Sequence, residues 1–240
     1  MVSLRLDKPN LRHIKGFIFD LDGTLVNTMP VILSILKQGL ERRGARIPSL
    51  SVSYRLFGQI LGSPLPQGIR MVPTLMYRVA RVIGLKRLKA FFFALETTLL
   101  LRKAYDRAQL FPGTTKLLDK LRTRGFVLGL VSMGSRKGIM KILKRNGLEN
   151  HFTVVISRDE VRRQKPDPEG YILAQKTMKL PPSAIIAVGD LPTDVLAASR
   201  AGMLSIGITT GIFKIDWFEA SARPEAIINS LSEIERMLEN

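Results

Sequence analysis

Side chains able to do chemistry follow short apolar runs, directly or in the next loop, at several places in this 240-residue chain. The set comprises two carboxylate pairs, one hydroxyl and one ammonium: Asp20 and Asp22, Asp190 and Asp194, Ser132, and Lys165. A carboxylate can serve as a nucleophile, as a general acid or base, or as a ligand of a hard metal ion. A hydroxyl or an ammonium can hold an anionic oxygen. These six residues are therefore the candidates for an active site.

Composition narrows the chemistry that these residues could perform. The chain has no cysteine and only two histidines, which excludes disulfides, thiolate zinc sites, cysteine nucleophiles and histidine-rich metal sites. Any metal must be held mainly by oxygen ligands, which suits magnesium, calcium or manganese. The 37 basic residues outnumber the 20 acidic ones, and the net charge of +17 attracts anions such as phosphorylated metabolites, nucleic acid or an anionic membrane.

The apolar runs that precede these residues are predicted to be buried strands, with the ranges 16–19, 126–131, 152–156, 184–188 and 203–208. Amphipathic stretches predicted as helices alternate with them, at 135–146, after Asp167 as the N-cap, at 192–201 and from Pro224 to the C-terminal end. This alternation predicts an α/β fold with a Rossmann-like parallel sheet and helices on both faces. Ligands bind beyond the carboxyl ends of parallel strands, so the six candidate side chains should meet at one sheet edge.

Residues 28–108 show no strand signal and are predicted to be helical, at 30–43, 69–83 and 85–107, with a glycine- and proline-rich break at 62–66. We therefore divide the chain into a core of residues 1–27 and 109–240 and an inserted α-helical domain of residues 28–108. The insertion holds 14 Lys and Arg against 3 Asp and Glu, a net charge of +11. Its apolar runs at 91–93 and 99–101 are expected to form its core or an oligomer interface.

The candidate residues resemble, in order and in strand context, the four signature motifs of the haloacid dehalogenase (HAD) superfamily. The matching segments are Asp20-Leu21-Asp22-Gly23-Thr24, Ser132, Lys165-Pro166 and Gly189-Asp190-Leu191-Pro192-Thr193-Asp194. Within that superfamily the chain is most similar to the phosphoglycolate phosphatase-type hydrolases. The resemblance implies a HAD-like catalytic core, with the insertion as a cap domain that covers the site and selects the substrate.

The resemblance also implies a role for each candidate residue. Asp20 would attack phosphorus to form an aspartyl-phosphate, while Asp22 would protonate the leaving oxygen and then take a proton from the hydrolytic water. A magnesium ion held by Asp20, the backbone carbonyl of Asp22, and Asp190 would neutralise charge between nucleophile and phosphate. Ser132, Gly23 and Lys165 would bind the phosphate, and Lys165 would also stabilise the nucleophile. Asp194 would orient Lys165 or a water on the metal.

One position departs from the family pattern. Met133 follows Ser132, where relatives of this type usually have Asn. A polar contact near the phosphate is thereby lost, which puts substrate positioning in question but leaves the nucleophile unaffected. Ser135 or Arg136, at the start of the next predicted helix, could compensate.

The sequence thus predicts a magnesium-dependent phosphatase for a small phosphorylated metabolite, either a phosphoglycolate-type compound or a sugar phosphate monoester. Two alternatives stay open: a phosphomutase of the same superfamily, and a basic protein that binds nucleic acid or an anionic membrane surface with an idle core. We expect a monomer or homodimer. A cytoplasmic location is expected because no signal peptide is apparent and the longest apolar stretch, residues 90–101, is too short to span a bilayer.

Overall fold

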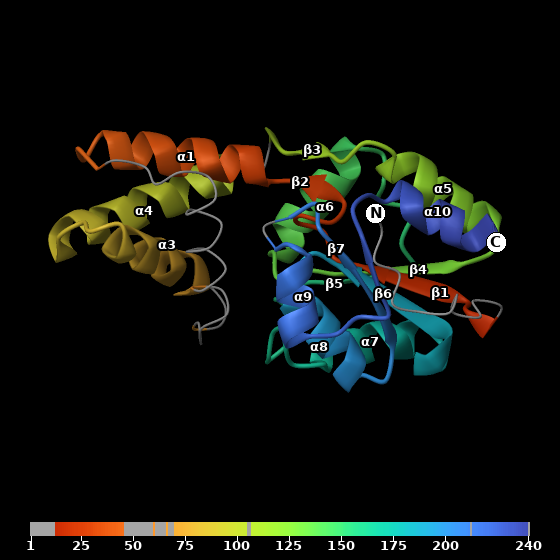
Figure 1. Ribbon diagram of the computed structural model, residues 1–240. Helices are drawn as coiled ribbons and strands as arrows, with labels where there is room; N and C mark the ends of the chain where they lie inside the picture. The colour runs from red at the N-terminus through yellow and green to blue at the C-terminus, as the bar shows by residue number, and fades with distance from the viewer. Residues whose placement is uncertain are drawn as a thin grey trace. The chain divides into compact units, whose positions relative to one another are not determined.

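The computed structural model describes residues 13–45, 60, 66, 70–104, 107–211 and 213–239. The chain divides into two compact units (Figure 1). The first, called the core unit, comprises residues 1–27 and 109–240, and the second, called the helical unit, comprises residues 28–108.

The core unit is built on a six-stranded parallel sheet with the order β5-β4-β1-β6-β7-β8 (Figure 1). The strands are β1 (Gly16–Phe19), β4 (Val127–Val131), β5 (Val154–Ile156), β6 (Ile185–Gly189), β7 (Leu204–Ile208) and β8 (Ala226–Ile228). Strand β1 lies in the middle of the sheet, between β4 and β6. The predicted α/β class with a parallel sheet is confirmed.

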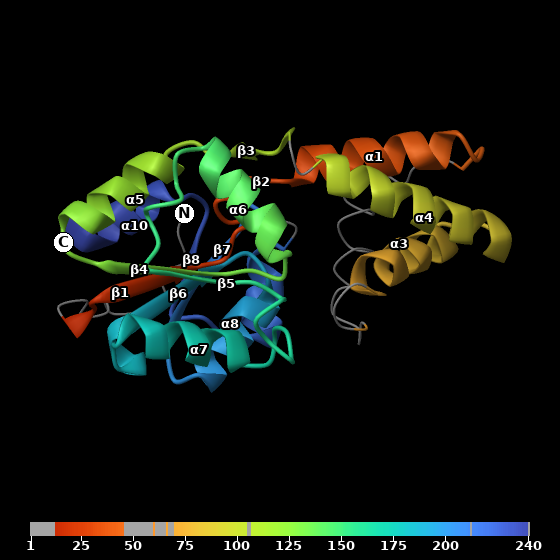
Figure 2. The same cartoon turned by 180° about the vertical axis from the view of Figure 1, so that it is seen from behind.

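Helices cover both faces of this sheet, as the two opposite views show (Figures 1 and 2). One face carries α5 (Thr114–Thr123), α6 (Arg136–Arg145) and α10 (Ser232–Glu239). The other carries α7 (Glu169–Met178) and α8 (Pro192–Arg200), with α9 (Ile215–Ser221) against α8 and the short 3-10 helix η4 (Pro182–Ala184) before β6. Because both faces are covered, the central strands consist of apolar residues throughout.

Strand β1 shows how the two faces are filled. Successive side chains on a strand point to opposite faces. Ile18 belongs to a buried cluster with Tyr171 and Met178 of α7, whereas Phe17 stacks on Phe19 with ring centroids 6.0 Å apart. All three β1 side chains are at most 1% exposed, so the strand that leads to Asp20, the candidate nucleophile, is packed on both sides.

The C-terminal end corrects one prediction. No helix starts at Pro224; residues 226–228 instead form β8, which pairs in parallel with β7, and the helix α10 begins only at Ser232. Three consecutive apolar residues are too short a run to identify as a strand without their neighbour. Burial of all three side chains at the sheet edge decides the conformation.

The helical unit contains α1 (Met29–Glu41), α3 (Met71–Val82) and α4 (Arg87–Ala104), in agreement with the three predicted helices to within three residues at each described end. Helix α4 packs on both α1 and α3. The predicted break at 62–66 lies outside the described residues except for Pro66. None of the helices within the described ranges is long and apolar enough to cross a bilayer.

A short antiparallel pair joins the two units. The two-residue strands β2 (Val26–Asn27) and β3 (Gln109–Leu110) lie next to each other at the points where the chain leaves the core unit and returns to it. Strands of two residues are too short to be predicted from a periodic pattern of apolar residues. The chain therefore enters and leaves the helical unit at one place.

Candidate active site

The sheet register brings the candidate side chains to one edge. Phe19, the last residue of β1, pairs with Leu130 of β4 on one side and with Val188 of β6 on the other. The next residues along these three strands lead directly to Asp20, Ser132 and Asp190, all of which are less than 10% exposed. The rule that ligands bind beyond the carboxyl ends of parallel strands, called the strand-end rule, therefore places the candidate nucleophile Asp20 between a hydroxyl and a second carboxylate.

Lys165 joins this edge from the loop before α7. Its ammonium donates to Oδ1 of Asp20 at 2.7 Å and to the backbone carbonyl of Val131 at 2.7 Å, and it lies 2.6 Å from Oδ1 of Asp194. Its side chain is 3% exposed. An ammonium has three donors, and all three have oxygen partners here. Lys165 thus fixes the position of Asp20 and supplies a buried positive charge beside it.

Asp194 holds Lys165 from the first turn of α8. One of its oxygens contacts the Lys165 ammonium, and Oδ2 accepts a hydrogen bond from the backbone N–H of Leu191 at 3.0 Å. Asp194 therefore caps its own helix and orients the lysine at the same time. Gly189 leaves the room for this arrangement, since a Cβ there would lie 2.3 Å from Cβ of Asp194.

Burial and crowding shift the protonation of these acidic groups. Burial raises the pKa of Asp20 to about 8, and the charges of Asp194 and Asp22 add to the rise although Lys165 opposes it. Burial, with repulsion from Asp20 and Asp194, holds the pKa of Asp190 well above its usual range. Burial alone would lower the pKa of Lys165, but attraction by Asp194 and Asp20 outweighs it and holds that pKa well above the usual value. The lysine stays charged, and a further cation beside the carboxyl groups would lower their raised pKa values.

The donor set fits a divalent metal ion. Asp20, Asp190 and Asp194 each offer an oxygen, and these oxygens lie within 4.8 Å of one another. Oδ1 of Asp190 is buried and accepts no hydrogen bond from any described residue. Both oxygens of Asp194 already have partners, so Asp20 and Asp190 are the better candidates for ligands. Several buried carboxylate oxygens around an unused acceptor suit a hard cation such as magnesium.

Asp22 and Gly23 belong to a tight turn between β1 and β2. Asp22 forms an isolated bridge with Val26, and the N–H of Gly23 donates to the carbonyl of Val26 at 2.9 Å. Gly23 adopts φ +85°, where a side chain is unfavourable. The charge of Asp22 raises the pKa of both Asp20 and Asp190, so Asp22 adds to the negative charge at this edge.

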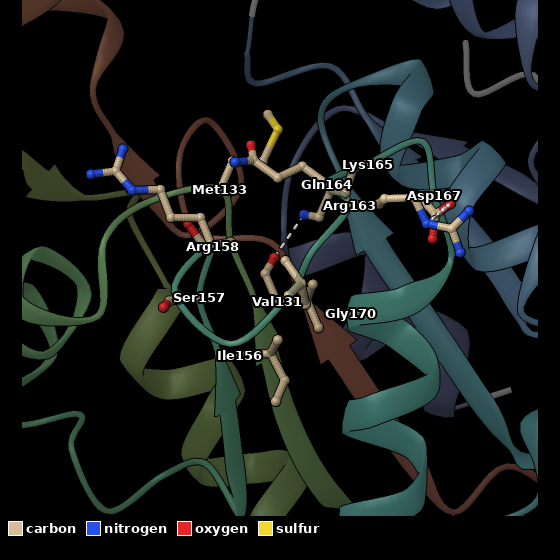
Figure 3. Close-up of a pocket in the computed structure, with 12 residues that line it drawn as sticks. Val131, Met133, Ile156, Ser157, Arg158, Arg163, Gln164, Lys165, Asp167 and Gly170 are labelled. Atoms are coloured by element: carbon tan, nitrogen blue, oxygen red, sulfur yellow. Dashed lines mark hydrogen bonds and ion pairs between the residues drawn. The ribbon is translucent and has the colours of Figure 1, made fainter. Parts of the chain in front are cut away.

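The segment after β4 borders a small pocket beside Lys165 (Figure 3). Ser132 and Met133 line it together with Arg158 and Gln164. The hydroxyl oxygen of Ser132 accepts a hydrogen bond from the backbone N–H of Gly134 at 3.0 Å, which fixes the turn that follows the strand. Met133, where the resemblance to the HAD superfamily implies an asparagine, is among the residues that line this pocket (Figure 3).

Two residues after β7 reach the site although no sequence motif marked them. The hydroxyl of Thr210 donates to the backbone carbonyl of Gly23 at 2.6 Å. Gly211 lies directly against Asp190, since a Cβ at this glycine would be 1.8 Å from Oδ2 of that carboxylate. The available signal was their position behind the carboxyl end of the predicted strand 203–208, the same rule that identified the other candidates.

The comparison with protein families decides the assignment. The model of the family described as haloacid dehalogenase-like hydrolase matches residues 17–208. The chain belongs to this family. The predicted membership of the HAD superfamily is confirmed, and the matched range spans all four motifs and the helical unit.

Curated relatives of this HAD protein are phosphatases. Phosphoglycolate phosphatase of Salmonella typhimurium strain LT2 is 26% identical over 233 residues, which cover 93% of this chain and 92% of the relative. IndB of Dickeya dadantii, assigned as a phosphatase, is 30% identical over 220 residues, 90% of each chain. The predicted enzyme class, a phosphoric monoester hydrolase, is confirmed at this level.

Solved structures show the same fold. A phosphoglycolate phosphatase assigned by prediction, from Haemophilus somnus 129PT, superposes with a TM-score of 0.75 at 21% identity, covering 94% of this chain and 98% of the other. A protein from Thermotoga maritima assigned as a beta-phosphoglucomutase gives a TM-score of 0.71 at 21% identity, covering 94% of this chain and 99% of the other. At such identities the likeness concerns the fold alone. The cytoplasmic location stays a prediction.

Proposed function

We propose that this HAD phosphatase hydrolyses a small phosphate monoester through an aspartyl-phosphate formed on Asp20. The observation that carries the proposal is the contact of Lys165 with both Asp20 and Asp194 at a buried sheet edge. A lysine with all three donors in use holds one oxygen of Asp20 in place. The other oxygen is left to attack phosphorus, with the ester oxygen as leaving group.

Asp22 is the proposed acid and base. It follows Asp20 by two residues on the same turn, and its charge acts on both neighbouring carboxylates. A carboxyl group in this position protonates the leaving oxygen and then accepts a proton from the water that hydrolyses the aspartyl-phosphate. Ser132 and the backbone N–H groups around Gly23 are the proposed partners of the phosphoryl oxygens.

Magnesium is the proposed cofactor, with Asp20, the backbone carbonyl of Asp22, and Asp190 as ligands. When bound, it supplies positive charge between two anions that would otherwise repel each other. The raised pKa values of Asp20 and Asp190 support this role, because a bound cation would offset the burial and mutual repulsion that disfavour their charged forms. Lys165 adds its own charge to the same region and can reach a phosphoryl oxygen by exchanging one of its three acceptors.

The substrate class follows from the relatives. Proteins named phosphoglycolate phosphatase are among the curated matches, so phosphoglycolate-type compounds and sugar phosphate monoesters are the proposed substrates. A phosphomutase remains the second candidate, because one solved neighbour carries that assignment. Release of inorganic phosphate without an isomeric sugar phosphate separates the two activities. A binding protein with an idle core is the less favoured alternative, since it has no need for buried carboxylates around a lysine.

The decisive experiment is Asp20→Asn, assayed with magnesium against a panel of small phosphate esters. Turnover should be abolished because the amide is a poor nucleophile, and no acid-stable covalent phosphate should form on the protein. Asp216→Asn, on the exposed surface of α9, is the matched control and should leave the rate unchanged. Appreciable hydrolysis by a folded Asp20→Asn protein would contradict covalent catalysis at this residue.

A further inference from the structure

Helix α4 of the helical unit carries its large apolar side chains on the outside. Leu88, Phe91, Phe92, Leu95 and Leu99 are each at least 50% exposed. Large apolar side chains are ordinarily the ones that a helix buries. A continuous exposed set of this kind marks a surface that meets something other than water.

The opposite face of α4 explains why the large residues point outward. Among residues 87–101, whose burial the structure describes, the buried ones are mostly small: Ala90, Ala94, Thr97 and Thr98, with Phe93 as the one large member. The hydroxyls of Thr97 and Thr98 donate to carbonyls of their own helix, to Phe93 and Ala94 respectively, at 2.6 Å each. The inner face is thus complete within the unit, and the helix is apolar on both sides.

The exposed side chains form one stripe with basic residues beside its N-terminal end. At 3.6 residues per turn, the five large residues fall within an arc of about 100°. Arg87 and Lys89 project about 100° to either side of Leu88, and both are exposed, as are Lys86 and Arg81 nearby. Long basic side chains beside an apolar stripe can bury their stems while the charges reach outward.

We propose that this stripe, called the α4 face, docks on an anionic lipid surface. A helix with Phe and Leu on one side and Lys or Arg at the borders is the arrangement that inserts into the headgroup region of a bilayer. The proposal concerns the helical unit and is independent of the reaction proposed for the core unit.

The charge of the helical unit favours an anionic lipid surface over a second copy of the chain as the partner of the α4 face. The helical unit has 14 Lys and Arg against 3 Asp and Glu, so pairing two α4 faces would bring two strongly positive surfaces together. Of the acidic residues, Glu96 already pairs with Arg42 and Arg43. An anionic bilayer would bury the apolar stripe and would also attract the surrounding positive charge with its headgroups.

The test is sedimentation of the full-length protein with vesicles of phosphatidylcholine alone and of phosphatidylcholine mixed with phosphatidylglycerol. Binding should require the anionic lipid and should weaken as salt is raised. The variant Arg87→Gln/Lys89→Gln should bind about 25-fold more weakly, from about five-fold per basic residue near an anionic surface. The control Lys116→Gln/Lys137→Gln, on exposed positions of α5 and α6, should bind as the unchanged protein does.

A second variant tests the apolar stripe. Phe91→Gln/Leu95→Gln should reduce binding to the mixed vesicles at least ten-fold, because the bilayer no longer buries these side chains. Ile172→Gln is the matched control, since this residue is an exposed large apolar side chain on α7 of the core unit. Both variants change exposed positions and should keep the circular dichroism spectrum of the unchanged protein.

Three results would overturn the proposal. The first is absence of binding to the anionic vesicles at low salt. The second is an equal loss of binding in the control and the α4 variants. The third is a dimer in sedimentation velocity that Phe91→Gln/Leu95→Gln converts to a monomer, which would assign the α4 face to a second copy.

Discussion

Replacing Lys165 with methionine should destabilise the core unit far more than replacing a surface lysine. Methionine fills similar space but removes the buried cation that contacts Asp20 at 2.7 Å and Asp194 at 2.6 Å. Removing one partner of a buried ion pair costs about 3–5 kcal/mol, because the other charge remains buried without compensation. An exposed pair is worth only about 0–1 kcal/mol. The expected loss in the free energy of unfolding is therefore several kcal/mol.

The size of this loss should depend on pH. In the unchanged protein the pKa of Asp20 is about 8, well above the unfolded value of about 4. The folded state therefore binds the proton more tightly, and the contribution of Asp20 to stability falls as pH rises between these two values. Lys165→Met removes an attraction that lowers the pKa of Asp20. The pKa rises further, and the full cost appears only at alkaline pH.

The assay is urea unfolding of the full-length protein without divalent ions, at pH values on either side of 8. Trp217, the only tryptophan, lies on α9 of the core unit, so its fluorescence reports unfolding of that unit. Lys116→Met, at an exposed position of α5, is the control. Adding Asp194→Asn to Lys165→Met should recover part of the loss. A loss no larger than that of the control at every pH would refute the reasoning.

Two further predictions concern the ligands of the metal. Asp190→Asn should weaken magnesium binding at least ten-fold in calorimetry. Asp22→Asn should slow turnover but change magnesium affinity much less, because the backbone carbonyl proposed as a ligand is kept. An equal loss of magnesium affinity in both variants would contradict this division of roles. Gly211→Ala should also weaken magnesium binding, because the added Cβ would lie 1.8 Å from Oδ2 of Asp190 and must displace that carboxylate. An unchanged affinity in Gly211→Ala would show that the loop yields instead.

The central strands could be predicted because each is a continuous apolar run. Predicted strand 16–19 coincides with β1, the predictions for β4 and β7 start one residue too early, and the prediction for β6 is one residue off at both ends. Helix α5 is absent from the predicted elements, although Leu117, Leu118 and Leu121 bury its inner side. The segments missed are short or polar ones whose conformation depends on burial against a neighbour.

The candidate site could be predicted as far as the strand-end rule reaches. That rule brings Asp20, Ser132 and Asp190 to one edge, and the structure places them there. It says nothing of how loops pass over the edge. Two contacts depend on such loop paths: Lys165 donates to a backbone carbonyl as its third acceptor, and Gly211 approaches Asp190. Contacts made by backbone atoms cannot be predicted from the types of the residues.

Because of the strand pair β2–β3, the helical unit is an insertion that begins and ends at one place in the core unit. Asn27 and Gln109 face each other across this ladder, so the two ends of residues 28–108 meet at backbone positions about 5 Å apart. A two-residue turn such as Asn-Gly could close β2 and β3 into a hairpin in their place. Every strand of the six-stranded sheet lies outside this segment. The segment can therefore be lengthened, shortened or replaced at a single point of insertion while Asp20 and Lys165 keep their places.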